Sequence, residues 1–484
     1  MNNKIINATK WSMLAEITAK LAAPLVNLVL ARLLSPNEFG IVASITIITS
    51  FADIFTDAGF QKFVIQHEFN NDNTLNQYSD VAFTSNTILS IIIYIIIFTF
   101  RHSLAVAIGC PEVSLGLAVA ALTVLCTSFS SIAIARFRRD LDFKPLFYIR
   151  LGSSLIPLFI TVPLAFLMKN YWALVIGTVA QQLFIAVLSI ALSKYNPHLR
   201  LNKKMFQDMF GFSMWNLCES ISFWFAGQAN IFIVAGALNS YYLGLYKTGM
   251  STINSYLAII TAAITPILFS TLSRVQNNKE LYNKTFDKFQ QAMALFVLPM
   301  GVGIYLYRYL VVQILLGSQW TEIADFMGLW AVMSSITITY SNTACEVYRS
   351  KGKPKVSFGL QMFYLIFFIP AIYLSANKSF VALCYAGCFI RLLPVVFDII
   401  TLKLKFGIKF ISILKNTYSQ IIATGVMALC GFQLQMFSET ISWQFFSIGI
   451  CIIVYIIVVC LFPNIRKEIK MIKKNYKNKA RRLA

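Results

Sequence analysis

Long apolar runs follow one another along the whole chain and are separated by short polar segments. A helix needs about 20 mostly apolar residues to cross a bilayer, and only helices and closed barrels satisfy their backbone in lipid. Runs such as 88–100 and 448–461 are continuously apolar, which excludes the alternating pattern of a barrel strand. The chain is therefore predicted to be an all-α polytopic membrane protein with fourteen spans, at residues 11–34, 39–62, 80–100, 113–135, 146–167, 171–193, 208–236, 241–271, 290–308, 322–347, 356–376, 379–402, 411–434 and 441–462.

Positive charges are concentrated in every second gap between these runs. Basic groups occupy 136–144, 194–204, 274–288, 349–355, 403–415 and 466–482, whereas the gaps around 35–37, 239–240 and 435–440 carry almost none. Cytoplasmic loops of membrane proteins carry an excess of Lys and Arg. We therefore predict an even number of spans with both termini in the cytoplasm. Few of the 41 Lys and Arg fall on the opposite side, namely Arg32, Arg101, Lys169, Arg308 and Lys378.

The composition agrees with this class. Of the 484 residues, 57% are hydrophobic and 13% charged, against about 25% charged in soluble domains. The formal net charge of +21 would suit nucleic acid, but basic loops between apolar spans contact anionic lipid. We therefore expect membrane lipids as partners and no nucleic acid. The cysteines lie mostly within spans and the histidines lie far apart, so we expect neither a disulfide framework nor a metal site.

An internal repeat relates the two halves of the chain. Residues 31–40, after the first span, resemble residues 235–244, after the seventh, with Ala, Leu and Gly identical in one register. Glu16 precedes Asn27 by the same interval that separates Glu219 from Asn230, about three helical turns, so each pair shares a helix face. Both spans run in the same direction, and parallel repeats are a known transporter plan. Chance similarity between two apolar helices is the alternative.

Three cations lie within predicted spans, where charge is costly and marks candidate functional residues. Lys20 lies about 15 Å into the first span and Arg391 near the middle of the twelfth, whereas Lys247 lies about 10 Å from the outer surface. Cations on three helices suit an anionic headgroup such as a diphosphate, which arginine binds bidentately. We predict that they bind substrate in a central cavity, together with Asn27 and Asn230.

Each cation also has a structural alternative. Glu16 lies one turn before Lys20 and could form an ion pair that only packs helices. Asp398 lies on the same face as Arg391, two turns further on. The side chain of Lys247 is long enough to reach the membrane surface.

Carboxylates within the spans are candidates for ion coupling. Asp53 and Asp57 lie one turn apart near the inner end of the second span, and two carboxylates this close favour holding a proton. Glu16 and Glu219 join them as acidic residues on the repeated face. Asp57 also begins an Asp-Ala-Gly sequence that is typical of a helix end, so a structural role for it is equally supported.

Motifs of several enzyme classes are absent from the sequence. It contains no phosphate-binding loop of the Walker type, and neither the Gly-x-Ser-x-Gly nor the His-Glu-x-x-His motif of hydrolases. The predicted external loops are too short for the catalytic loop that a membrane glycosyltransferase or polymerase would need. We therefore predict that the chain is not an enzyme.

Six stretches recur in the order typical of one family. They are ARLLSPNEFG (31–40), DAGFQKFVIQ (57–66), RRDLDFK (138–144), YWALVIG (171–177), PILFSTLSRVQ (266–276) and YRSKGKPK (348–355). With them the chain resembles the Wzx-type oligosaccharide flippases, in the polysaccharide and colanic-acid exporter branch of the multidrug/oligosaccharidyl-lipid/polysaccharide (MOP) exporter superfamily.

The resemblance implies two six-helix lobes around a central cavity, at residues 1–204 and 205–405, two further helices at 406–463 and a basic cytoplasmic tail at 464–484. It implies alternating access that moves a polyprenyl-diphosphate-linked oligosaccharide to the outer leaflet of a bacterial inner membrane. It also implies Na⁺ or H⁺ as coupling ion without another cofactor, and a polysaccharide polymerase and chain-length machinery as partners. A multidrug/cation antiporter of the same superfamily is the alternative, against which the cavity cations argue.

Overall fold

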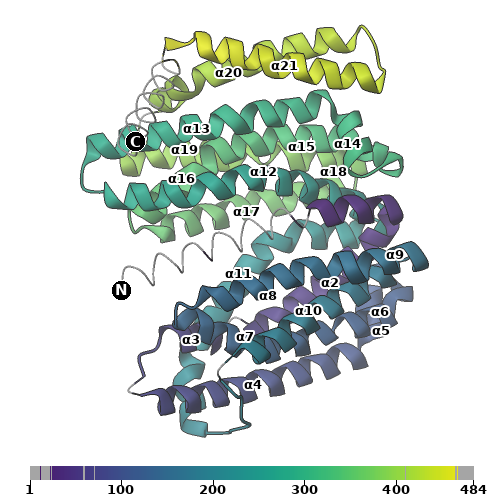
Figure 1. Cartoon of the computed structure of the whole chain (residues 1–484), viewed down its shortest axis with the longest axis vertical. Helices are drawn as coiled ribbons and strands as arrows, with labels where there is room; N and C mark the ends of the chain where they lie inside the picture. The colour runs from purple at the N-terminus through teal and green to yellow at the C-terminus, as the bar shows by residue number, and fades with distance from the viewer. Residues whose placement is uncertain are drawn as a thin grey trace, which may run out of the picture. The chain divides into compact units, whose positions relative to one another are not determined.

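The computed structural model describes residues 11, 22, 24–57, 60–69, 71–193, 195–408, 410–463 and 466. Throughout these ranges the regular elements are helices (Figure 1). The chain divides into two compact units. The first comprises Met1–Ser255, Leu315–Trp320 and Leu365–Ala386, and the second comprises Tyr256–Ile314, Thr321–Tyr364 and Gly387–Ala484. The predicted division into lobes at residue 204 stays a prediction.

The first unit is built on helices from the first half of the chain. Of these, α4, α7, α10 and α8 lie side by side in Figure 1, and α2 packs against α7. The helices are Pro24–Leu33, α2 (Pro36–Asp57), α3 (Phe60–Gln66), α4 (Asp72–Thr99), α5 (Arg101–Ala107), α6 (Ser114–Ala120), α7 (Leu122–Arg139), α8 (Phe143–Ile156), α9 (Val162–Met168), α10 (Trp172–Leu192) and α11 (Lys203–Ala237).

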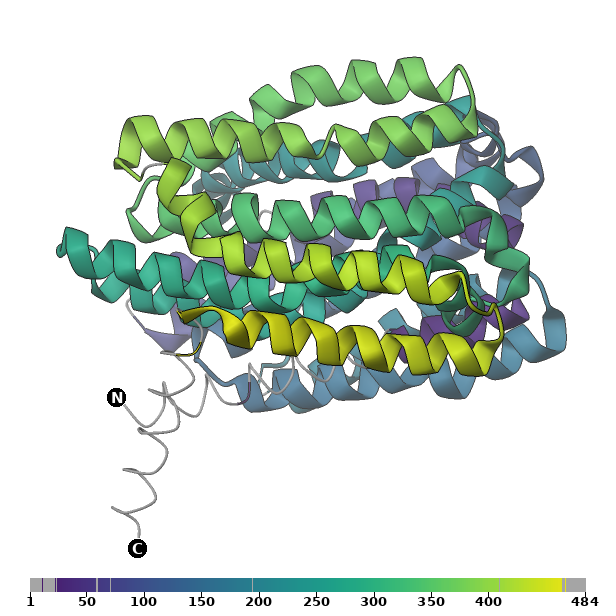
Figure 2. The same cartoon turned by 90° about the horizontal axis from the view of Figure 1, so that it is seen from above.

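The second unit contains most of the remaining helices. Helices α20 and α21, at the yellow end of the chain, run side by side in Figures 1 and 2. Helices α12 and α17 each contribute residues to both units. The helices of this half are α12 (Ser240–Arg274), α13 (Lys279–Leu306), α14 (Arg308–Leu315), α15 (Ala324–Thr337), α16 (Thr343–Ser350), α17 (Pro354–Ala376), α18 (Phe380–Phe389), α19 (Leu392–Phe406), α20 (Phe410–Gln435) and α21 (Ile441–Leu461).

The predicted all-α membrane fold is confirmed. Among the described residues, ten helices are long and apolar enough to cross a membrane, and the count of fourteen spans stays a prediction. Two predicted starts were wrong, because α4 begins at Asp72 and not at 80, and α13 begins at Lys279 and not at 290. The side chains of Asn71 and Asn278 accept hydrogen bonds from the first turns of these helices, so both helices begin with a polar, capped segment before the apolar run.

Several predicted spans contain irregular backbone. Pro157 opens a π-helical stretch, Pro157–Thr161, between α8 and α9. A second π-helix, Ile338–Asn342, separates α15 from α16, and the twelfth span breaks at residues 390–391, three residues before Pro394. Proline removes a backbone donor and disrupts the preceding turn, and π-helical turns are frequent at functional sites.

The internal repeat places its two halves in direct contact within the first unit. A Cβ added to Gly40 of α2 would lie 1.6 Å from the carbonyl oxygen of Ser240, and one added to Gly244 of α12 would lie 1.8 Å from that of Pro36. In the aligned repeat Gly40 corresponds to Gly244 and Pro36 to Ser240. The first turns of α2 and α12 therefore cross backbone to backbone through equivalent positions, which requires glycine at both.

The residues next to this crossing hold the end of the helix Pro24–Leu33. Trp320 is fully buried and donates from Nε1 to the carbonyl of Ala31 at 2.8 Å. Gln319 donates to the carbonyls of Ala31 (2.6 Å) and Leu34 (2.9 Å). The last carbonyls of a helix lack partners within it, so these two side chains supply the missing donors.

Arginines at the end of α7 organise the opposite end of the first unit. Arg139 donates to the carbonyls of Val64 (2.8 Å) and His67 (2.6 Å), at the C-terminal end of α3. Arg138 donates to Gln61 at 3.1 Å. From the sequence, these two arginines were interpreted only as part of a basic loop that orients the chain in the membrane. In the structure, Arg139 also satisfies backbone acceptors at the end of a short helix.

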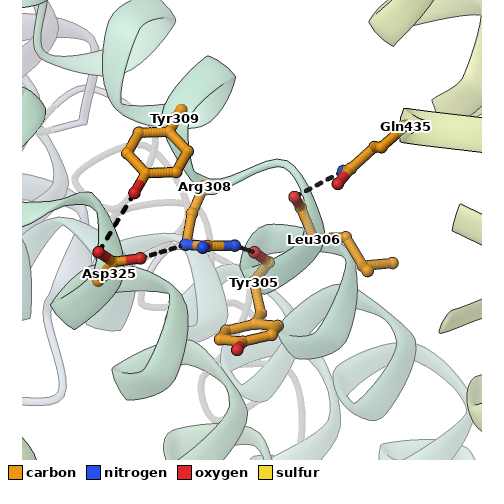
Figure 3. A network of polar contacts seen from close by, with 6 residues as sticks. All are labelled: Tyr305, Leu306, Arg308, Tyr309, Asp325 and Gln435. Carbon is orange, nitrogen blue, oxygen red and sulfur yellow. Dashed lines mark hydrogen bonds and ion pairs between the residues drawn. The ribbon is translucent and has the colours of Figure 1, made fainter. Parts of the chain in front are cut away.

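A polar network joins the helix ends of the second unit (Figure 3). Arg308 contacts the carboxylate of Asp325 at 2.5 Å and donates to the carbonyl of Tyr305 at 3.1 Å. Tyr309 donates to the other oxygen of Asp325 at 3.2 Å, and Gln435 of α20 donates to the carbonyl of Leu306 at 2.7 Å. The network fixes the turn between α13 and α14 against α15 and α20.

Candidate functional site

A partly polar cavity of about 320 Å³ lies inside the first unit, between α2, α6, α7 and α10. Among the described residues that line it, Asp53 is the only acidic one. Ligand pockets for drug-sized molecules occupy about 300–1,000 Å³, so this cavity can hold an ion with a few waters and is too small for an oligosaccharide. The lining residues are Val42, Ile45, Thr46, Thr49, Ser50, Asp53, Ala120, Thr123, Val175, Thr178, Gln181, Gln182 and Ile185.

Helical spacing assembles the polar wall that α2 contributes. Thr46, Thr49, Ser50 and Asp53 recur at intervals of three and four residues, so they lie on one face of α2. The same helix has mainly apolar residues elsewhere, and Ala43, Ile47 and Ala52 are buried in the unit. The sequence therefore gives α2 one polar stripe, and packing against α7 and α10 encloses it.

Three hydroxyl groups of the cavity donate their hydrogens to backbone carbonyls three or four residues earlier in the chain. Thr46 donates to the carbonyl of Val42 (2.5 Å), Thr123 to that of Ala120 (2.7 Å) and Thr178 to that of Val175 (2.8 Å). A hydroxyl has one hydrogen and two lone pairs. These side chains can therefore offer only acceptor oxygens to a ligand, which together with a carboxylate is the donor set of hard cations.

Trp224 of α11 covers one edge of the cavity wall. Its indole donates from Nε1 to the hydroxyl of Ser50 at 3.0 Å, and its ring lies 4.9 Å from that of Phe51. The contact links α11, which carries the second copy of the repeat, to the cavity-lining face of α2.

The second unit holds Arg391 at the break of its twelfth span. The guanidinium lies 4.2 Å from the ring centroid of Trp330, which is 2% exposed. The hydroxyl of Thr337, the last residue of α15, donates to the carbonyl of Arg391 at 3.2 Å. Stacking on an aromatic face holds the plane of the guanidinium.

Asp398, the proposed alternative partner of Arg391, is a buried carboxylate with hydroxyl partners. It accepts hydrogen bonds from Ser341, in the π-helix, and from Tyr348 at 2.9 Å. Ser341 thus joins the π-helix to α19 two turns after the break, whereas Thr337, at the end of α15, contacts the break itself at Arg391.

The structure places only some of the predicted site residues. Lys20 and Glu16 lie outside the described residues. Asp57 ends α2 and Glu219 lies within α11, and their side chains are outside the described part of the structure. Asp53 lines the cavity above, and a role for Asp57 beside it stays a prediction.

The remaining predicted residues lie on separate helices of the first unit. Asn27 is half-buried on Pro24–Leu33, and Lys247 is half-buried near the start of α12. Asn230 is 7% exposed and its amide contacts the sulfur of Met250 at 3.6 Å, which joins α11 to α12. That these residues share a cavity with Lys20 and Arg391 stays a prediction.

Several residues of the cavity were not identified from the sequence. Gln181 and Gln182 stand alone as amides in the otherwise apolar α10, and Thr46 and Ser50 precede Asp53 at helical spacing. This spacing is present in the sequence, but uncharged hydroxyl and amide groups stand out less in an apolar span than a carboxylate does. Among the described residues, no three His, Cys, Asp or Glu are grouped as metal ligands would be.

Comparison with known proteins identifies the family. Residues 29–325, more than half of the chain, match the family described as "Polysaccharide biosynthesis protein". An uncharacterized membrane protein in the cps region of Klebsiella pneumoniae is 24% identical over 377 residues, which cover 77% of this chain and 76% of that protein. The lipopolysaccharide biosynthesis protein WzxC of Escherichia coli is 20% identical over 397 residues, covering 78% and 76%.

Solved structures identify the fold. The lipid II flippase MurJ, in an inward closed conformation, superposes with a TM-score of 0.74 at 13% identity, covering 94% of this chain and 98% of that one. An inward-facing MATE family transporter of the MOP superfamily gives a TM-score of 0.58 at 12% identity, covering 86% and 98%. The chain is thus a multi-pass membrane protein of the MOP flippase fold, and it belongs to the polysaccharide biosynthesis protein family.

Proposed function

We propose that this chain flips a polyprenyl-diphosphate-linked oligosaccharide, the repeat unit of a surface polysaccharide, from the inner to the outer leaflet of the bacterial inner membrane. The family match over residues 29–325 carries the proposal. A flippase fold supports it, and so does the distribution of basic loops, which favours both termini in the cytoplasm. A polysaccharide polymerase and chain-length machinery would receive the product.

Cations in the spans are the proposed contacts for the diphosphate. Arg391 supports this role because its guanidinium is stacked on Trp330 at a helix break, where planar N–H groups can bind phosphate oxygens. Lys20, Lys247, Asn27 and Asn230 are proposed as further cavity residues on the basis of the sequence.

An ion gradient is the proposed energy source, with Asp53 as coupling carboxylate. The cavity around Asp53 supports this because it is acceptor-rich and of a size for a hydrated Na⁺ or for a proton with its waters. Asp57, Glu16 and Glu219 remain proposed coupling residues from the sequence. Cation binding at one carboxylate can shift a two-state equilibrium only if the two states differ in affinity.

Complementation tests the function directly. We expect the chain, expressed together with its own polysaccharide genes, to restore surface polysaccharide in a host that lacks its flippase. Without the chain, lipid-linked repeat units should accumulate in the inner leaflet. The proposal is wrong if repeat units reach the surface equally well without it. Drug resistance gained without any change in polysaccharide would favour the multidrug/cation antiporter instead.

A further inference from the structure

A second cavity, of about 530 Å³, is an apolar groove on the first unit between α3, α4 and the start of α11. Its long wall is one face of α4 and includes Val81, Ile88 and Ile92, and Phe206 and Phe210 of α11 form the facing wall. Among the described residues that line it, Lys203 is the only charged one. The groove therefore combines a hydrocarbon surface with a single cation.

The groove has the length of one membrane leaflet. Along α4, Val81 and Ile92 are separated by about 16 Å of helical rise, close to the roughly 15 Å of hydrocarbon in half a bilayer. Asp80, where the predicted third span begins, accepts a hydrogen bond from Tyr195 in the basic segment 194–204, which is expected on the cytoplasmic side. The groove thus runs from the inner membrane surface to about the bilayer centre.

The residues that precede Lys203 are hydrogen-bonded to α4. Tyr195 donates from its hydroxyl to the buried carboxylate of Asp80 at 2.6 Å, and the backbone N–H of His198 donates to the same oxygen at 3.2 Å. The N–H of Arg200 donates to the hydroxyl of Thr84 at 2.9 Å. These bonds position the following residues, which include Lys203, at the inner end of the groove.

The charge at this end comes from side chains and not from the helix terminus. The side chain of Asn202 already accepts hydrogen bonds from the N–H groups of Lys204 (3.0 Å) and Met205 (3.2 Å). Lys203 and its neighbour Lys204 are exposed. The nearest carboxylate on α11, Asp208, accepts a hydrogen bond from Tyr78 at 3.0 Å.

We propose that this groove binds an anionic phospholipid of the inner leaflet, with one acyl chain along α4 and the phosphate at Lys203. Basic pockets between helices on the cytoplasmic side are typical sites for anionic headgroups. The single lining cation matches the one charge of a phosphodiester better than the charges of a diphosphate. A polyprenyl chain would be longer than this groove, which has the length of one leaflet. The site is separate from transport of the cargo and does not depend on the proposed function.

Binding of defined lipids to the purified full-length chain tests the proposal. Native mass spectrometry with phosphatidylglycerol and with phosphatidylcholine of the same acyl chains should show that the anionic lipid binds more tightly. Lys203→Ala should weaken phosphatidylglycerol binding roughly fivefold and leave phosphatidylcholine binding unchanged. Ser85→Phe, which fills the middle of the groove, should remove both.

Two control variants and a competitor make the test decisive. Lys288→Ala removes an exposed cation from α13, and Ile95→Phe enlarges a side chain of α4 outside the groove; both should bind lipid as the unaltered chain does. Lys203→Ala is an exposed change, so circular dichroism should show an intact helical fold. Equal binding of the two lipids, equal effects of the controls, or displacement of phosphatidylglycerol by a polyprenyl phosphate would each overturn the proposal.

Discussion

At the scale of single residues, the ligand preference of the cavity around Asp53 depends on which groups accept the hydrogen bonds of its threonine hydroxyls. Thr46, Thr123 and Thr178 each donate to a backbone carbonyl three or four residues earlier, so these hydroxyls present oxygen lone pairs next to a carboxylate. Such a lining attracts cations and repels anions. This separates the proposed ion site from the diphosphate contacts, which are cationic.

Replacing Asp53 should uncouple transport from the ion gradient. We expect Asp53→Asn to lower gradient-driven flipping at least tenfold, because the amide carries no charge for a cation to bind. Flipping of a labelled polyprenyl-diphosphate sugar in proteoliposomes, with Na⁺ or H⁺ gradients imposed and then collapsed, measures this. Asp140→Asn, at an exposed helix end, is the control. A variant at Asp53 that still responds to the gradient would exclude this site.

Arg391 allows a test that separates phosphate binding from packing. Arg391→Ala should abolish surface polysaccharide while the protein still inserts, and Arg391→Lys should retain part of the activity because it keeps the charge but loses bidentate geometry. Trp330→Leu should also lower activity, because the guanidinium loses its stacking partner at 4.2 Å. Normal polysaccharide from Arg391→Ala would remove this residue from the cargo site.

The site was predictable from the sequence only in part. Asp53 was identified because a charge in an apolar span is conspicuous, and its Thr and Ser neighbours on α2 have a spacing that could have been read. Thr123, Gln181 and Gln182 lie on other helices, and no pattern within one sequence shows which helix faces meet. For the same reason, the hydroxyl partners of Asp398 were found only in the structure.

At the scale of helices, the crossing of α2 and α12 depends on two glycines. Gly244→Ala would place a methyl group 1.8 Å from the carbonyl oxygen of Pro36, so the helices must separate. We expect a loss of stability of about 1–3 kcal/mol, typical of overpacked contacts, seen as a lower thermal denaturation temperature in detergent. Gly449→Ala in α21, where a Cβ meets nothing within 4 Å, should leave that temperature unchanged or raise it.

The sequence predicted the positions of the helices more accurately than their ends and their breaks. Apolar length marks the part of a helix that crosses lipid, so α10, α20 and α21 were predicted within about a residue or two of their observed bounds. The polar first turns of α4 and α13 were missed because they extend beyond the apolar run. Pro394 indicates a break near the start of α19. The π-helix at Ile338–Asn342 contains no proline or glycine, so the sequence gives no sign of it.

At the scale of the whole molecule, the distribution of charge predicts the orientation. A fluorescent protein fused to the C-terminus should fold and fluoresce, because we expect that end in the cytoplasm. Alkaline phosphatase fused after Phe437, in the turn between α20 and α21, should be active because this turn is expected outside. The reverse pair of results would contradict the predicted orientation and, with it, the assignment of the phospholipid groove to the inner leaflet.

The contact between α2 and α12 has the form of an interface between identical subunits. Pro36 and Gly40 of α2 occupy the same positions of the repeat as Ser240 and Gly244 of α12. The glycine of each helix contacts the first residue of the other helix. An isologous contact of this kind is what a two-fold axis produces. Two copies of a chain of half this length, carrying one repeat each, could therefore assemble in parallel through the same glycine crossing.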